Sequence, residues 1–81
     1  MKIVVRAFAI HREILGTGSL ELELPEGATA RAAFDAVFAG KPEAARLLNA
    51  TTFARNREYV SGDTVLAAGD ELAFIAPVAG G

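Results

Sequence analysis

The longest segment with helical periodicity lies between residues 29 and 39, and it limits the ways in which this chain can fold. Thr29 belongs to the residue types that cap helix N-termini, and Gly40 can end a helix. The apolar residues of the segment recur every three or four positions and form one stripe: Ala30, Ala33, Phe34, Val37 and Phe38. A helix with one apolar stripe covers one face of a sheet. We therefore expect a helix from Thr29 to about Ala39 that packs on a sheet made by the rest of the chain.

Short segments with the composition of strands lie on both sides of this helix. Before it, Lys2 to Ala9 is rich in Ile and Val, and Ser19 to Leu24 alternates between polar residues and leucine. We expect these two segments to form an N-terminal hairpin, with residues 10–18 as an irregular turn. After the helix we expect a second short helix and four more strands: Pro42 to Leu48, then Thr52 to Arg55, Glu58 to Val60, Thr64 to Leu66 and Glu71 to Ala76. This order predicts an α+β fold in which one main helix packs on one face of a mixed sheet.

The other face of such a sheet is left without a helix to cover it. Strand alternation places Ile3, Val5, Leu20 and Leu22 beneath the helix, and it places Val4, Phe8 and Ile75 on the opposite face. An exposed apolar patch usually marks a binding surface. We therefore expect Phe8 and Ile75 to contact a partner.

The composition narrows the classes of function. A chain of 81 residues with 52% hydrophobic and 22% charged residues is expected to form one ordered domain. It has no cysteine, which excludes disulfides, zinc–thiolate sites and thiol catalysis and fits a reducing compartment. The formal net charge of −2 disfavours binding to nucleic acid. No apolar run approaches the ~20 residues that cross a bilayer, and no export signal is recognisable, so we expect a cytoplasmic protein.

Residues that could carry out catalysis are few. His11 is the single histidine, and we interpret it as a surface loop residue because no activated nucleophile accompanies it. Three acidic residues could hold a metal ion, but each lies in a turn beside glycine, so no metal site is expected: Asp63, Asp70 and Glu71. Arg55 and Arg57 are expected to share a strand face, as a solvated pair or as a contact for an acidic partner.

The sequence ends in two glycines that follow a proline and small residues. A diglycine segment has no side chains, so it can enter a narrow channel in another protein. Its terminal carboxylate is ionised at neutral pH and can attack an activated phosphate such as that of ATP. We expect residues 1–76 to form the folded domain and residues 77–81 to form a flexible tail.

Two groups of residues carry a resemblance to a known family. Near the start they are Phe8-Ala9, Arg12-Glu13 and Gly16, and toward the end they are Asn56, Leu66, Gly69-Asp70-Glu71, Ala73-Phe74 and Pro77-Val78-Ala79-Gly80-Gly81. With these motifs the chain resembles the ubiquitin-like β-grasp sulfur carriers, and within them the small subunits of molybdopterin synthases. One departure is Ala76, where the family commonly has a proline.

The resemblance implies a carrier that is not an enzyme by itself. In that family an E1-like enzyme uses ATP to adenylate the terminal glycine, a sulfur donor converts it to a thiocarboxylate, and the large catalytic subunit passes the sulfur to a pterin precursor. Carried onto this sequence, Gly81 bears the thiocarboxylate and Gly80 provides clearance. The residues that would face the partner are Phe8, Arg12, Tyr59, Ile75, Pro77, Val78 and Ala79. The resemblance implies no bound cofactor, because the activating enzyme consumes the ATP.

Several alternatives stay open at the level of the sequence. The chain could carry sulfur for thiamine synthesis or for tRNA thiolation. It could also be a protein modifier that is joined to lysines, or a β-grasp binding module whose tail is inert. The sequence does not distinguish molybdenum from tungsten as the metal that the finished cofactor holds.

Overall fold

The computed structural model describes residues 1–76, which form a sheet with helices packed against it. In chain order the elements are β1 (Lys2–Ala7), α1 (Ala9–Leu15), β2 (Ser19–Glu23), α2 (Ala30–Val37), α3 (Ala44–Asn49), β3 (Thr52–Arg55), β4 (Glu58–Val60) and β5 (Glu71–Ile75). The predicted α+β class and the main helix are confirmed. In this part of the chain, no helix has the length and apolar character needed to span a membrane.

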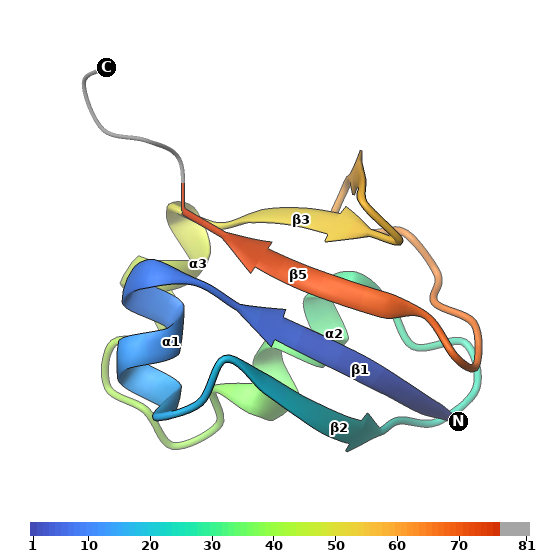
Figure 1. Cartoon of the computed structure of the whole chain (residues 1–81), viewed down its shortest axis with the longest axis horizontal. Coiled ribbons are helices and arrows are strands. Elements are labelled where there is room, and N and C mark those ends of the chain that lie inside the picture. The colour runs from blue at the N-terminus through green and yellow to red at the C-terminus, as the bar shows by residue number, and fades with distance from the viewer. Residues whose placement is uncertain (77–81) are drawn as a thin grey trace.

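The sheet is mixed and has the strand order β2-β1-β5-β3-β4, with β5 in the centre (Figure 1). β1 pairs antiparallel with β2 and parallel with β5. β5 also pairs antiparallel with β3, so that Phe74 lies opposite Phe53. The first and last strands of the fold therefore lie side by side.

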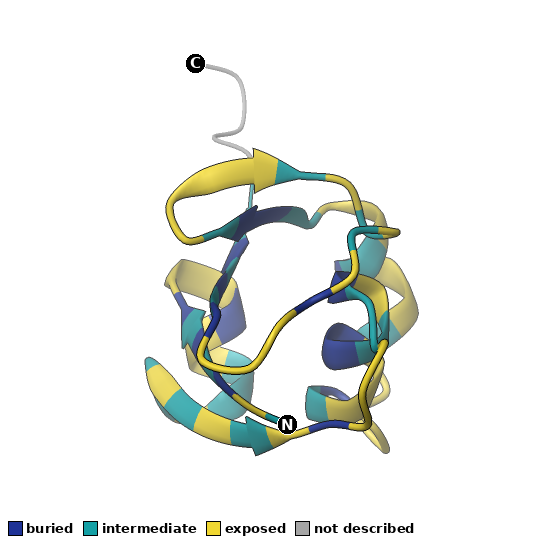
Figure 2. Ribbon diagram, turned by 90° about the vertical axis from the view of Figure 1, so that its right-hand side faces the viewer, coloured by how far each residue is buried: buried dark blue, intermediate teal, exposed yellow. Residues whose placement is uncertain are grey.

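The core lies between α2 and the sheet. The Thr29 hydroxyl oxygen accepts a hydrogen bond from the Ala32 N–H at 3.1 Å, as expected for the N-cap of α2. Behind this cap, Phe34 packs against Phe38 and Phe74, with ring centroids 4.6 and 5.4 Å apart. Figure 2 shows buried positions on the inner sides of the elements, whereas β2 alternates between exposed and half-buried residues.

The prediction of an irregular turn over residues 10–18 is wrong, because Ala9–Leu15 forms α1. Gly16 ends this helix in the left-handed conformation, with φ of 79°, and its N–H donates to the carbonyl of Arg12 at 2.8 Å. His11 is fully buried, so its interpretation as a surface loop residue is also wrong. His11, Ile14 and Leu15 follow helical spacing on the inner side of α1, and the charged residues and glycines around them obscured this spacing.

Several predicted boundaries and one predicted strand also differ from the structure. β1 ends at Ala7, and the second short helix runs from Ala44 to Asn49 instead of from Pro42 to Leu48. The segment 64–66 is not a strand, and its one ladder contact is an isolated bridge between Val65 and Thr29. Its backbone pairs with the start of α2, where the Ala30 N–H donates to the Thr64 carbonyl.

Candidate functional site

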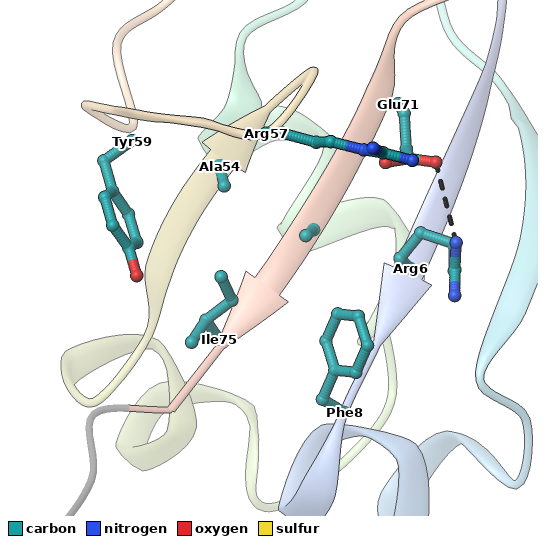
Figure 3. A pocket seen from close by; sticks show the side chains of 8 residues that line it. Arg6, Phe8, Ala54, Arg57, Tyr59, Glu71 and Ile75 are labelled. Atoms are coloured by element: carbon teal, nitrogen blue, oxygen red, sulfur yellow. Dashed lines mark ion pairs between the residues drawn. The ribbon is translucent and has the colours of Figure 1, made fainter.

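The face of the sheet that α2 leaves uncovered contains a groove of about 290 Å³. Its lining combines large side chains with two alanines: Arg6, Phe8, Ala54, Arg57, Tyr59, Glu71, Ala73 and Ile75 (Figure 3). Ala54 of β3 lies opposite Ala73 of β5 and opposite Tyr59 of β4. The small alanines form the floor of the groove because larger residues surround them.

Phe8 and Ile75 lie together in this groove, on the face that strand alternation predicts. β1 pairs in parallel with β5, and Ala7 lies opposite Phe74, so the next residues of the two strands, Phe8 and Ile75, follow side by side. Ala9 then turns the chain into α1 with φ of 48°, which leaves the Phe8 side chain outside the core. Phe8 is 46% exposed and Tyr59 is 74% exposed. These two aromatic side chains are therefore free to contact another molecule.

The groove also contains charged side chains. A guanidinium nitrogen of Arg6 lies 3.6 Å from a carboxylate oxygen of Glu71, and the guanidinium carbon lies 5.7 Å from the centroid of the Phe8 ring. The Arg6 Nε is buried and has no hydrogen-bond partner in residues 1–76. The Arg57 side chain extends across the sheet toward Glu71 (Figure 3). Two guanidinium groups and one carboxylate therefore share the groove.

A set of hydrogen bonds fixes the edge of the groove beside Arg57. Asn56 Nδ2 donates to Asp70 Oδ1 at 3.0 Å, and Asn56 Oδ1 accepts from the Glu71 N–H at 2.9 Å. Asp70 Oδ2 also accepts from the Ala67 N–H at 2.8 Å. These bonds join the turn between β3 and β4 to the start of β5. Asp70 thus has a structural role, and in residues 1–76 no three acidic or histidine side chains gather where they could hold a metal ion.

Two other candidate residues lie away from the groove. Arg12 is exposed on α1 and does not line it. Arg55 is opposite Leu72, on the helix-covered side, and its Nη1 donates to the Val65 carbonyl at 3.1 Å. The expectation that Arg55 and Arg57 share a strand face is therefore wrong, because Arg57 belongs to the turn. The predicted residues of the tail lie outside the described part of the chain: Pro77, Val78, Ala79, Gly80 and Gly81.

Four groove residues were not predicted as site residues: Arg6, Ala54, Glu71 and Ala73. Strand alternation carries a signal for Arg6, which shares the face of Phe8. The floor of the groove depends on which residues of β3 and β5 lie opposite each other. No local pattern gives this register.

The sheet order, the covering helix and the open groove define a ubiquitin-like β-grasp domain. The model of the ThiS family matches residues 5–81, and the chain belongs to this family.

Two curated relatives match the whole chain. The molybdopterin synthase sulfur carrier subunit of Arabidopsis thaliana is 32% identical over 81 residues, which cover 100% of this chain and 84% of the relative. That of Chlamydomonas reinhardtii is 35% identical over 83 residues, which cover 100% of both chains.

Solved structures agree with this assignment. SAMP1 from Haloferax volcanii superposes with a TM-score of 0.85 and 28% identity over 100% of both chains. A putative molybdopterin converting factor subunit 1 from Pyrococcus furiosus gives a TM-score of 0.83 and 29% identity, and covers 96% of this chain and 99% of the other.

Proposed function

We propose that this chain is the sulfur-carrier subunit of a molybdopterin synthase and acts in molybdenum cofactor biosynthesis. The observation that carries the proposal is the match to two molybdopterin synthase sulfur carrier subunits across the whole chain, at 32% and 35% identity. The chain is not an enzyme by itself, and the catalytic groups belong to the large subunit. We place the protein in the cytoplasm, because a chain without cysteine suits a reducing compartment.

The chemistry is proposed for the carboxylate of Gly81. An E1-like enzyme binds the carrier and ATP, and the carboxylate attacks the α-phosphate, which forms an acyl-adenylate and releases pyrophosphate. Sulfur at the sulfide level from a donor then attacks the acyl carbon and displaces AMP, which leaves a thiocarboxylate. In the large subunit this sulfur passes to the pterin precursor. Gly80 and Gly81 carry no side chain, which suits a narrow channel to the reacting atoms.

The groove on the open face supports docking next to the tail. Ile75 is the last residue of β5 and lines the groove, so a partner bound there lies beside the segment that leads to residues 77–81. Phe8 and Tyr59 offer aromatic area, and aromatic residues contribute strongly to binding energy at interfaces. We propose that the large subunit and the E1-like enzyme both use this groove. We propose that the interface extends beyond the groove and that Arg12 of α1 contacts the partner there. Three further contacts come from Pro77, Val78 and Ala79.

Mass spectrometry of the C-terminal peptide tests the chemistry. Incubation with the E1-like enzyme, ATP and a sulfur donor should add the mass of one oxygen-to-sulfur exchange to the peptide that contains Gly81. A chain without Gly81, or with one residue added after it, should not gain this mass, because the reacting carbonyl is out of register. Reactions without ATP provide the control. Full sulfur transfer by the chain without Gly81 would refute the carrier function.

A second candidate function is protein modification. The observation in its favour is the similarity to SAMP1, the small archaeal modifier protein 1 of Haloferax volcanii, at 28% identity. A modifier shares the activation step, but its acyl group passes to a lysine amine instead of being converted to a thiocarboxylate. Peptides in which Gly81 is joined to a lysine side chain would identify this function, and tryptic digests of the cell extract can be searched for them.

A further inference from the structure

The turn between β3 and β4 contains an arginine in an unfavourable backbone conformation. Asn56 and Arg57 have φ of 50° and 72°, and they connect Arg55 to Glu58, which pair across the hairpin. Two consecutive residues with positive φ define a type I′ hairpin turn, in which glycine is preferred at the second position. Any side chain in this region costs free energy, because its Cβ crowds the backbone. Glycine at position 57 would avoid this cost.

The hydrogen bonds of the turn account for Asn56 but not for Arg57. Asn56 tolerates the left-handed region, and its amide bonds Asp70 and the backbone of Glu71. By contrast, no carboxylate within residues 1–76 lies within 4.0 Å of the Arg57 guanidinium group. The Arg57 side chain lines the groove and extends toward Glu71 without pairing with it (Figure 3). A strained residue without a structural role for its side chain indicates a functional one.

The charges in the groove indicate what Arg57 binds. Glu71 is paired with Arg6, so Arg57 is the cation in excess. This local positive charge stands out on a chain whose formal net charge is −2. The floor made by Ala54 and Ala73 leaves room for a side chain from another molecule. An acidic side chain would neutralise the groove, whereas a basic one would add to its charge.

We propose that Arg57 determines the specificity of the groove by binding the carboxylate of an aspartate or glutamate that the partner inserts over Ala54 and Ala73. The identity of the partner rests on the proposed function. A planar guanidinium group binds a carboxylate through two parallel N–H···O hydrogen bonds, which gives direction as well as strength. The strain at Arg57 is thus retained because the side chain is needed in the complex.

The variant Arg57→Gly separates stability from binding. Its melting temperature should equal or exceed that of the wild type, because glycine adopts the observed φ without strain. Its Kd for the purified large subunit of molybdopterin synthase should rise about tenfold or more, the size expected when a charged hydrogen bond is lost. The dependence of Kd on salt should also become weaker. Arg31→Gln removes the same charge from the exposed side of α2 and should leave Kd within about twofold.

Charge reversal tests the chemistry of the occupant. Arg57→Glu should abolish binding, and one aspartate or glutamate of the large subunit, changed to arginine, should restore it. An Arg57→Gly chain that binds as tightly as the wild type would overturn this inference alone, as would the failure of every acidic-to-arginine change to restore binding. A wild-type chain that binds neither the large subunit nor the E1-like enzyme would refute the proposed function, and this inference with it.

Discussion

The Nε2 atom of His11 lies 2.7 Å from the hydroxyl oxygen of Thr51, a contact that joins α1 to the residue before β3. The Thr51 hydroxyl donates its single proton to the carbonyl of Leu47, so its oxygen accepts the proton on Nε2. The Nδ1 atom of the ring is buried and has no hydrogen-bond partner within residues 1–76. The ring packs against Phe38 and Phe74, with centroids 6.0 and 6.1 Å apart. His11 is thus a residue of the core.

Stability should depend on pH through His11. Burial lowers the pKa of His11 from its ordinary value of 6.5, and the backbone of Phe8 opposes part of this shift. The unfolded chain therefore binds the proton more readily than the folded one. The contribution of neutral His11 to stability is complete above about pH 6.5, and it is lost as pH falls from there toward the lower pKa of the folded state. Urea denaturation between about pH 7 and 5 should show decreasing stability.

The variant His11→Gln provides the control for this pH dependence, because glutamine does not titrate. It should be less stable at neutral pH, and its stability should change less over the same interval. Equal slopes for both chains would show that other groups cause the pH dependence.

Phe8→Asp should weaken binding to the large subunit without unfolding the chain. Phe8 is 46% exposed, so a charge there costs little in the free carrier, whereas it removes aromatic contact area in the complex. Phe74→Ala provides a matched change in the core, where Phe74 is fully buried, and should cost about 3–5 kcal/mol of folding stability. Thermal melts and titration calorimetry separate the two effects. Unfolding of the Phe8→Asp chain would place Phe8 in the core.

Asn56→Gly should destabilise the fold by about 1–2 kcal/mol, because it removes both side-chain hydrogen bonds that join the turn to β5. Glycine preserves the freedom to adopt φ of 50°, so the change isolates the hydrogen bonds. Asn49 on α3 is exposed, and Asn49→Ala offers a control with a small expected effect. Chemical denaturation measures both. A stability equal to the wild type would indicate that Asp70 and Glu71 find other partners.

Thr29→Ala should cost about 1 kcal/mol, since it removes the oxygen that accepts from the Ala32 N–H at the start of α2. Thr29→Ser keeps this oxygen and should retain most of the stability. Midpoints of urea unfolding for the two variants give the comparison. Similar losses in both would point to packing of the Thr29 methyl group instead of capping.

The parts of the fold that follow from local chemistry could be predicted from the sequence. Thr29 and the apolar stripe that includes Phe34 indicated α2, and alternation placed Phe8 on the open face. α1 was missed because His11, a polar residue, occupies its inner side, and a polar residue at a core position interrupts the periodic signal.

The groove could be predicted only in part. Strand alternation places its apolar residues on the open face, but the position of Arg57 depends on a turn whose positive φ is unusual for arginine. That Arg55 and Arg57 lie on different sides of the sheet could therefore be seen only from the backbone conformation of the turn. The floor of Ala54 and Ala73 required the register between strands that are separated in sequence by β4 and a long loop.

The central place of β5 has a consequence for how the chain is made. A ribosome releases β1 and β2 first, then β3 and β4, and each pair can close by itself as an antiparallel ladder. The two ladders have no strand in common until β5 emerges and pairs with both β1 and β3. In a nascent chain that stops short of Glu71, the two halves of the sheet are therefore not joined to each other. Their unpaired strand edges are then prone to aggregation or proteolysis. The sheet is thus complete only when β5, the strand that precedes the tail, has been synthesised. A chain truncated before β5 has no complete domain that a partner could bind.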